Sequence, residues 1–452
     1  MKLTIIGGGP GGYETALKAA ERGLEVTLIS AGPLGGTCLN EGCIPTKALR
    51  RSADVADLVA EAAGFGVEAS AGGVDLPRVM ARKEEIVGQL RSGIEFLLKK
   101  AKVTVLCGKA SFVDARTVRV ALQDGGEEAV TSDAIFVATG SVSASLPIPG
   151  ADFAVDSTAL LSTDAIPHRL CVIGAGVIGL EFASIFRSFG SEVTVLEYCK
   201  EILPRFDTDL SKRMKQSLSR KGISIETSAS VQGIAREADG SFKVSYIKKD
   251  QPQEVLADKV LMAVGRRPAL GSLNFEDIGI ETGKRGVVVD KDFQTSVPGI
   301  YAFGDIIGGY MLAHVATFQG LHALNHLTGV EDGIDFNVVP AAVFTSPEAA
   351  TVGLSEEECM EKGIPVECLK SNFRSNGKAV TMGETDGFCK VIVAAEDTAG
   401  YQAGQMLGCH LFGPHAADLI HEMSALIARR TTLAEFRDLI HAHPTLSEAL
   451  MV

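Results

Sequence analysis

Two segments of the chain repeat one design, and this repeat constrains the fold more than any other feature. A short apolar run over residues 2–6 leads into a GxGxxG motif at residues 7–12. A second apolar run, residues 169–173, leads into the same motif at residues 174–179. Each motif is followed by a helical pattern and another apolar strand. Because a glycine turn between a strand and a helix is typical of nucleotide-binding βαβ units, the sequence predicts two dinucleotide-binding domains.

The helices after the two motifs are expected at residues 13–22 and 180–189. Each ends at a glycine, Gly23 or Gly190, as helices often do because glycine readily adopts the left-handed conformation.

The glycines of the motifs are expected to bind pyrophosphate groups. The first allows a tight turn, the second lets the backbone approach the ligand, and the third lets the helix pack on the strand. The phosphates then lie at the helix N-terminus, where N–H groups and the dipole favour negative charge. The predicted positions are Gly7, Gly9 and Gly12 in the first motif and Gly174, Gly176 and Gly179 in the second.

The residue that ends the second strand of such a unit usually contacts the nucleotide ribose. In the second unit this residue is Glu197, 18 residues after Gly179. A carboxylate there would accept hydrogen bonds from the ribose of NAD and repel the 2′-phosphate of NADP; the alternative is a solvated charge at a strand end. The same offset in the first unit gives Ser30, whose hydroxyl would bind a ribose less strongly than a carboxylate.

Composition narrows the class of protein. The chain has 452 residues, enough for two to four domains, and a net charge of −13. This charge argues against nucleic acid and anionic membranes as partners.

We see no signal peptide at the N-terminus and no apolar run near the roughly 18 residues of a membrane span, so we expect a cytoplasmic protein. After about residue 335, a strand pattern at 388–393 and helical patterns at 416–430 and 433–440 indicate a separate α+β domain.

Only two of the nine cysteines, Cys38 and Cys43, lie close together in the sequence. Pro45 favours a helix that starts at Cys43, where the helix dipole would lower the thiol pKa. Lys47 lies one turn later on the same face. The pair is compatible with a structural disulfide, half of a metal site or a redox-active dithiol beside a flavin. We favour the dithiol, because no second CxxC or histidine cluster completes a metal site.

Residues 35–47 closely resemble the active-site segment of the FAD-dependent pyridine nucleotide-disulfide oxidoreductases, and the resemblance continues in order along nearly the whole chain. It implies an α/β fold with two Rossmann-like domains, for FAD and NAD, and a C-terminal α+β dimerisation domain. The boundaries that we expect are 1–145 for the first part of the FAD domain, 146–268 for the NAD domain, 269–335 for a central domain that completes the FAD site, and 336–452 for the dimerisation domain.

The resemblance also assigns residues to the cofactor sites. Asp305 would bind the ribityl chain of FAD, with a helix N-cap as the alternative role. Glu181 would pair with the active-site lysine near the nicotinamide, or be an ordinary acid at a helix N-terminus. Residues 317–320 depart from the family pattern, notably at Gln319. The further FAD positions are Gly36, Thr37, Lys47, Gly108, Thr139, Gly140, Ser141, Met311, Leu312, Ala313 and His314, and the further NAD position is Gly265.

A second motif near the C-terminus contains His443 and Glu448. Thiol–disulfide exchange needs a group that takes and returns a proton, a role that suits histidine, and a carboxylate would orient it. Thr445 and Glu448 also fit a capping box that opens a last short helix. The resemblance implies that His443 and Glu448 form a catalytic dyad, contributed by the other subunit of a homodimer.

Within the family, the sequence favours oxidation of dihydrolipoamide by NAD⁺. Glu197 indicates NAD, no cysteine follows Cys409, and the His443 motif resembles the lipoamide version. In the implied mechanism, dihydrolipoamide attacks the Cys38–Cys43 disulfide at Cys38, and Cys43 remains as a thiolate beside the flavin. The partners would be lipoylated carrier proteins of 2-oxoacid dehydrogenase or glycine cleavage complexes, and no metal is expected. The alternatives are a glutathione- or mercuric-reductase-like enzyme, an NADH diaphorase, and an NAD-binding sensor or scaffold with weak FAD binding.

Overall fold

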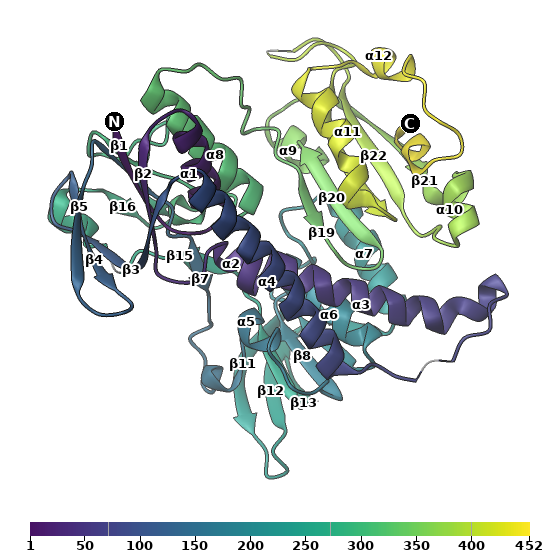
Figure 1. Ribbon diagram of the computed structural model, residues 1–452. Helices are drawn as coiled ribbons and strands as arrows, with labels where there is room; N and C mark the ends of the chain where they lie inside the picture. The colour runs from purple at the N-terminus through teal and green to yellow at the C-terminus, as the bar shows by residue number, and fades with distance from the viewer. Residues whose placement is uncertain (71, 272, 399) are drawn as a thin grey trace. The chain divides into compact units, whose positions relative to one another are not determined.

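In the computed structural model the chain forms two compact units, each assembled from segments that are distant in the sequence (Figure 1). The structure describes residues 1–70, 72–271, 273–398 and 400–452. The first unit comprises Met1–Leu49, Pro77–Ala144 and Gly265–Ile334; the second comprises Arg50–Leu76, Ser145–Val264 and Asp335–Val452. Our four domain boundaries, which divide the chain by role, stay a prediction.

A seven-stranded sheet with the order β18-β6-β1-β2-β3-β4-β5 forms the centre of the first unit. The strands from β18 to β3 run parallel, and β4 and β5 extend the sheet in antiparallel fashion. The strands are β1 (Lys2–Ile6), β2 (Glu25–Ser30), β3 (Thr104–Phe112), β4 (Thr117–Leu122), β5 (Glu127–Thr131), β6 (Ala134–Val137) and β18 (Ile300–Ala302). Leu3 and Ile5 of β1 are at most 1% exposed, as expected of a central parallel strand.

Helices and short strand pairs complete this unit. Helix α1 packs against α8, and β7 pairs with β15. Helix α3 begins in the first unit and ends in the second. These elements are α1 (Pro10–Glu21), α2 (Gly36–Glu41), α3 (Cys43–Glu61), α4 (Leu76–Lys100), α8 (Ala313–Thr328), β7 (Ser141–Ser143), β15 (Arg266–Pro268), β16 (Thr282–Gly283), β17 (Gly286–Val287) and the 3₁₀ turn η4 (Gly304–Ile307).

The second unit contains a parallel sheet with the order β10-β9-β8-β14 and an antiparallel sheet β11-β12-β13. The strands are β8 (Arg169–Ile173), β9 (Glu192–Leu196), β10 (Ile223–Glu226), β11 (Ala229–Arg236), β12 (Phe242–Lys248), β13 (Gln251–Ala257) and β14 (Lys259–Met262). The helices are α5 (Ser157–Leu160), α6 (Val177–Ser188) and α7 (Thr208–Arg220).

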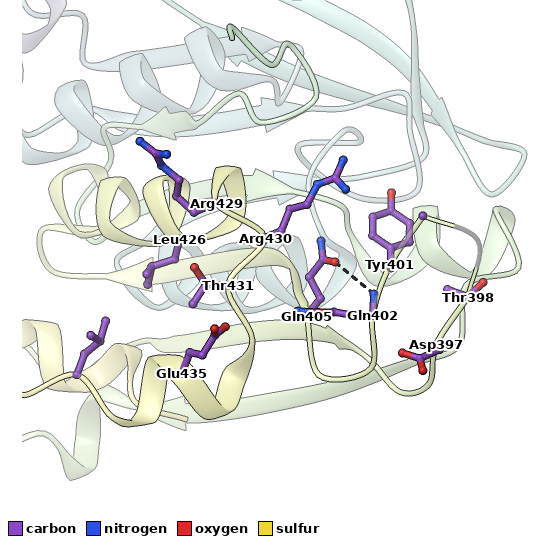
Figure 2. A pocket seen from close by; sticks show the side chains of 12 residues that line it. Asp397, Thr398, Tyr401, Gln402, Gln405, Leu426, Arg429, Arg430, Thr431 and Glu435 are labelled. Carbon is purple, nitrogen blue, oxygen red and sulfur yellow. Dashed lines mark hydrogen bonds between the residues drawn. The ribbon is translucent and has the colours of Figure 1, made fainter.

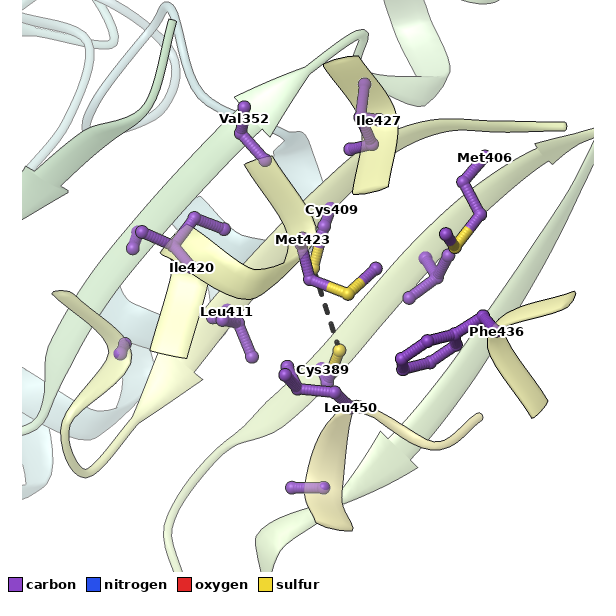
Figure 3. Packing of buried hydrophobic residues seen from close by; sticks show 14 of the residues in the cluster. Val352, Cys389, Met406, Cys409, Leu411, Ile420, Met423, Ile427, Phe436 and Leu450 are labelled. Atoms are coloured by element: carbon purple, nitrogen blue, oxygen red, sulfur yellow. Dashed lines mark hydrogen bonds between the residues drawn. The ribbon is translucent and has the colours of Figure 1, made fainter. Parts of the chain in front are cut away.

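The C-terminal part of the second unit is built on the antiparallel sheet β19-β20-β23-β22-β21. On one face, Cys389 and Cys409 lie 3.8 Å apart and pack with Met423, Phe436 and Leu450 (Figure 3). The elements are β19 (Ala341–Val343), β20 (Glu348–Gly353), β21 (Val366–Asn372), β22 (Phe388–Ala394), β23 (Met406–Gly413), α9 (Glu356–Glu361), α10 (Gly377–Met382), α11 (Ala416–Ala428), α12 (Leu433–Arg437) and η6 (Leu446–Leu450).

The predicted α/β class and the C-terminal α+β part are confirmed. The helices of both βαβ units begin three residues earlier than expected, at Pro10 and Val177, because the turn of each GxGxxG motif already provides the first helical residues. Gly23 and Gly190 follow the helices with φ values of +81° and +104°, as predicted. The last predicted helix is shorter than expected: α12 ends at Arg437 rather than at residue 440.

Candidate active site

Each GxGxxG motif forms a tight turn between a parallel strand and a helix. Gly7 and Gly174 have φ values of +125° and +103°, which residues with a Cβ rarely adopt. A Cβ at Gly12 would lie 1.8 Å from the carbonyl oxygen of Gly7, and a Cβ at Gly179 would lie 2.0 Å from that of Gly174. The first and third glycines are therefore required by the turn itself.

The second glycine of each motif instead borders open space. A Cβ at Gly176 would have no described atom within 4 Å, and a Cβ at Gly9 would meet only the Cα of Gly36, at 4.0 Å. Both glycines are N-caps of helices that have no side-chain cap hydrogen bond in the described structure. The N–H groups of the first helical turn are then suited to bind phosphate oxygens. The residues of both loops thus fit a dinucleotide pyrophosphate.

This difference between glycines predicts two separable phenotypes in the second motif. Gly179→Ala is expected to lower the melting temperature by about 10 °C or more, because its Cβ would clash with backbone. Gly176→Ala is expected to leave the melting temperature unchanged and to raise the KM for NAD⁺ at least about tenfold, because its Cβ would occupy the ligand space. Thermal unfolding and steady-state kinetics measure the two effects. Equal loss of stability in both variants would contradict this assignment.

The residues at the two ribose positions differ in their hydrogen bonds. Ser30 is 4% exposed, and its hydroxyl donates to the carbonyl oxygen of Gly32 at 2.8 Å. Glu197 is 7% exposed, and its Oε2 and Oε1 accept from the N–H groups of Ala175 and Cys199 at 2.6 and 2.7 Å. The Glu197 carboxylate therefore holds the glycine loop in place. Its contact with NAD stays a prediction.

The two close cysteines lie at the junction of two helices. Cys38 is in α2, and Cys43 is the first residue of α3, as predicted. Both are half-buried thiols. The hydrogen bond with the Cys43 side chain and burial raise the pKa of Cys38. The raised pKa favours a protonated Cys38 that donates to Cys43; the role of each sulfur toward a flavin stays a prediction.

Sequence reasoning missed Tyr13, the first residue after the first motif. Burial, then the neighbouring Glu14, raises the pKa of the Tyr13 hydroxyl, and the charge of Cys38 contributes in the same direction. Tyr13 therefore shares the surroundings of Cys38 as a neutral phenol. The motif could not predict that Tyr13 lies near Cys38, because Tyr13 belongs to α1 and Cys38 to α2.

The predicted ribityl ligand Asp305 belongs to a hydrogen-bonded chain. Ser141 Oγ donates to Asp305 Oδ2 at 2.5 Å, and Arg266 donates to Ser141 Oγ at 2.7 Å and to its carbonyl oxygen at 2.8 Å. Arg266 is a second residue that sequence reasoning missed. It fixes Ser141, which in turn orients Asp305.

Gln319, at which the sequence departs from the family, has a clear structural role. It is 8% exposed, and its Oε1 accepts from the N–H of Gly304 at 2.8 Å. Because Gly304 begins the turn that carries Asp305, Gln319 holds this turn in place. The departure therefore leaves the predicted flavin site with a supporting contact.

The other predicted FAD residues lie in the same unit. Thr37 is in α2, Gly36 begins it, and Lys47 is in α3. Gly140 accepts from Ala269 N–H at 3.0 Å. The residues around the start of α8 are Met311, Leu312, Ala313 and His314. The residues that follow β6 are Thr139, Gly140 and Ser141.

Three further predicted positions have roles in the local structure. A Cβ at Gly108 would lie 2.4 Å from the carbonyl oxygen of Ala121 in β4, so the sheet itself requires this glycine. Glu181 is 4% exposed, and its Oε1 accepts from Phe344 N–H at 3.0 Å. Gly265 has a φ of +117° and belongs to the first unit. Their contacts with cofactors stay predictions.

His443 and Glu448 are hydrogen-bonded to each other in the second unit. Nδ1 of His443 lies 2.9 Å from Oε1 of Glu448, and Oε2 of Glu448 accepts from Thr445 N–H at 2.9 Å. The Thr445 N–H first, and then His443, lower the pKa of Glu448. The carboxylate thus caps η6 and orients the imidazole at the same time. The His443 side chain is 77% exposed, so Nε2 is available to a substrate or a partner.

A cavity of about 850 Å³ lies elsewhere, between the β22–β23 connection, the end of α11 and α12 (Figure 2). Arg429, Arg430, Tyr401 and Glu435 are among its lining residues, and none of our predicted site residues is. Among the described residues, no group of three or more His, Cys, Asp or Glu could hold a metal ion, and no helix is long and apolar enough to cross a membrane.

The two glycine loops, the cysteine pair and the histidine–carboxylate pair together define a class of protein: an oxidoreductase that binds two dinucleotides and carries a dithiol. Residues 1–320 match the family model "Pyridine nucleotide-disulphide oxidoreductase", and residues 339–452 match its dimerisation domain. The chain therefore belongs to the pyridine nucleotide-disulphide oxidoreductase family, uses FAD and NAD as cofactors, and carries the family's dimerisation domain.

Individual relatives cover the whole chain. Dihydrolipoyl dehydrogenase of Geobacillus stearothermophilus is 39% identical over 99% of this chain and 94% of its own length. Leghemoglobin reductase of Glycine max is also 39% identical, over 99% of this chain and 86% of its own length. Among solved structures, the HOCl-induced flavoprotein disulfide reductase RclA from Escherichia coli has a TM-score of 0.87 at 30% identity and covers 100% of this chain and 98% of that one.

Proposed function

We propose that the protein oxidises dihydrolipoyl groups with NAD⁺, through Cys38, Cys43 and FAD. The observation that carries this proposal is the His443–Glu448 hydrogen bond, at 2.9 Å, in a chain that is 39% identical to dihydrolipoyl dehydrogenases over nearly its full length. A thiol substrate needs a base of this kind, and the histidine motif resembles the lipoamide version.

In the proposed reaction, one substrate sulfur attacks Cys38 of the Cys38–Cys43 disulfide, and Cys43 leaves as a thiolate. His443 takes the proton of the attacking thiol, with Glu448 holding the ring. The second substrate sulfur then displaces Cys38, so that the substrate leaves as the cyclic disulfide and Cys38 regains a proton. The first glycine loop and Asp305 would hold FAD, which would supply a two-electron acceptor between the Cys38–Cys43 dithiol and NAD⁺. Lys47, one turn after Cys43, would stabilise negative charge beside Cys43.

The residues proposed to bind the cofactors belong to the two glycine loops, to η4 and to the position after β9. Gly9 and Gly176 would leave room for the pyrophosphates, Asp305 would bind the ribityl chain, and Glu197 would favour NAD over NADP. We further propose a homodimer in which the partner supplies His443, lipoylated carrier proteins as substrates, and a cytoplasmic location.

The decisive experiment compares lipoamide with oxidised glutathione, each with both nicotinamide cofactors. We expect kcat/KM for the lipoamide and NAD pair to exceed the other three combinations at least about 100-fold, because the glutamate and the histidine motif both select for it. Steady-state absorbance at the nicotinamide band measures the rates. Preference for glutathione, or for NADP, would replace the proposal with a glutathione-reductase-like function.

A further inference from the structure

A buried lysine lies on the face of the C-terminal sheet opposite to the core of Figure 3. Cys389 points into that core, and Val391 belongs to the same buried cluster. Because side chains alternate along a strand, Lys390 of β22 points to the other face. Its side chain is only 1% exposed. Burying an ammonium group is strongly unfavourable unless it is paired with charges of opposite sign.

Three carboxylates from two distant segments surround this ammonium. Lys390 Nζ lies 2.8 Å from Asp207 Oδ2, 2.8 Å from Asp209 Oδ2 and 2.6 Å from Glu356 Oε2. Asp207 is itself 0% exposed, whereas the other two carboxylates are partly solvated. The pairing of Lys390 with Asp207 is therefore the fully buried contact of the cluster.

Asp207 connects the lysine to helix α7. Its Oδ1 accepts from the N–H groups of Asp209 and Leu210 at 3.0 and 3.4 Å, and so caps the N-terminus of α7. Lys370 first, and then Lys390, lower the pKa of Asp209 to about 2. Helix α7 also packs against β23 of the same sheet. The lysine thus fixes the start of α7 from the side of the C-terminal sheet.

The segment before α7 reaches the second glycine motif. Residues 198–206 connect Glu197 to Asp207, and within them the N–H of Leu203 donates to the carbonyl oxygen of Ala175 at 3.0 Å. Ser211 of α7 donates to the carbonyl oxygen of Leu203 at 3.4 Å. The other end of the segment is held by Glu197, whose carboxylate binds Ala175 N–H.

We propose that Lys390 is a positioning residue for NAD⁺. Through Asp207 and α7, it holds residues 198–206 against Ala175 and so keeps the glycine motif and Glu197 in the conformation that binds the dinucleotide. This role rests on the proposed function only in that NAD⁺ is the acceptor of the reaction. It requires no contact between Lys390 and the ligand.

The test removes both members of the buried Lys390–Asp207 pair together, so that neither is left buried without the other, and the carboxylates that lose the lysine, Asp209 and Glu356, are 40% and 42% exposed. In the double variant Lys390→Met/Asp207→Asn, methionine fills the lysine volume and asparagine can still cap α7. We expect the KM for NAD⁺ and the dissociation constant for NADH to rise about five- to tenfold, because the loop loses its fixed position. The KM for dihydrolipoamide should stay unchanged. NADH binding is measured on the fully reduced holoenzyme, which can take no further electrons from NADH, by the change in flavin absorbance.

Lys370→Met is the matched control. Lys370 lies directly across from Lys390 in β21, and its Nζ is also 2.8 Å from Asp209 Oδ2, but its side chain is 46% exposed. Because the buried pair is intact in this variant, its dissociation constant for NADH should change less than about twofold.

The outcomes separate positioning from stability. A lower melting temperature or a smaller active fraction, with NADH affinity and the KM for NAD⁺ unchanged, would overturn the proposal, since a purely structural lysine gives that result. If the double variant does not fold, Asp207→Asn alone is tested, because asparagine can still cap α7. An unchanged NADH affinity in that variant would also overturn the proposal. NADH titration needs no dithiol, so a wild-type protein that fails to oxidise dihydrolipoamide would refute the proposed function and leave this comparison valid.

Discussion

Replacing Cys38 with serine is expected to lower the rate of NAD⁺ reduction by dihydrolipoamide about 1,000-fold or more. Serine cannot form the disulfide that the substrate attacks. Cys43 would keep its position at the start of α3, where the helix dipole favours its thiolate. Reduction of an artificial dye by NADH should persist, because it uses the two nucleotide sites without the dithiol.

Two measurements make this result interpretable. Flavin content and dye reduction establish that Cys38→Ser has folded and bound its cofactors. Cys107→Ser is the control, because Cys107 is an exposed thiol in β3 with no assigned role in the reaction. Substantial dihydrolipoamide oxidation by the Cys38 variant would refute the proposed mechanism.

Replacing His443 with glutamine is expected to lower kcat with dihydrolipoamide about 100- to 10,000-fold, the range typical for the loss of a general base. Glutamine cannot take the thiol proton. Because the His443 side chain is largely exposed and contacts Glu448, the change should have little effect on the melting temperature. Stopped-flow reduction of the flavin by dihydrolipoamide measures the step directly.

Glu448→Gln separates the two roles of the carboxylate. Glutamine can also serve in a capping box, so η6 should keep its contact with Thr445, whereas the negative charge beside His443 is lost. We expect a loss of at least about tenfold in kcat, because the orienting carboxylate is gone. His415→Asn is a suitable control, since His415 is exposed and its φ of +55° is one that asparagine tolerates. Full activity of Glu448→Gln would leave only the capping role.

The pKa of Glu448 also predicts the sign of a pH effect. Its pKa lies below the ordinary value in the folded protein, so its contacts with Thr445 and His443 are fully present above the ordinary glutamate pKa of about 4.3. They are lost only as the pH falls through the lowered pKa. Loss of activity between pH 5 and 7 is therefore not expected to come from protonation of Glu448. In this range, the acid limb of the pH–activity profile of Glu448→Gln should have the same slope as that of the wild type.

Local sequence patterns predicted those features that depend on a few consecutive residues. Both glycine turns, the start of α3 at Cys43 and the capping contact of Glu448 were expected, because backbone sterics and helix ends act over four or five positions. The early starts of α1 and α6 were missed, since the helical pattern of side chains begins only after the turn. The end of α12 was missed because the apolar residues after Arg437 continue the pattern, although Ile440 is 99% exposed.

The amino-acid sequence alone determined the two dinucleotide turns, the dithiol and the histidine–carboxylate pair, and with them the family. Only the tertiary structure decided what supports these groups. Arg266 reaches Ser141 across 125 residues, and Lys390 reaches Asp207 across 183. No local pattern marks such partners, because a buried charge is tolerated only where the fold brings an opposite charge to it.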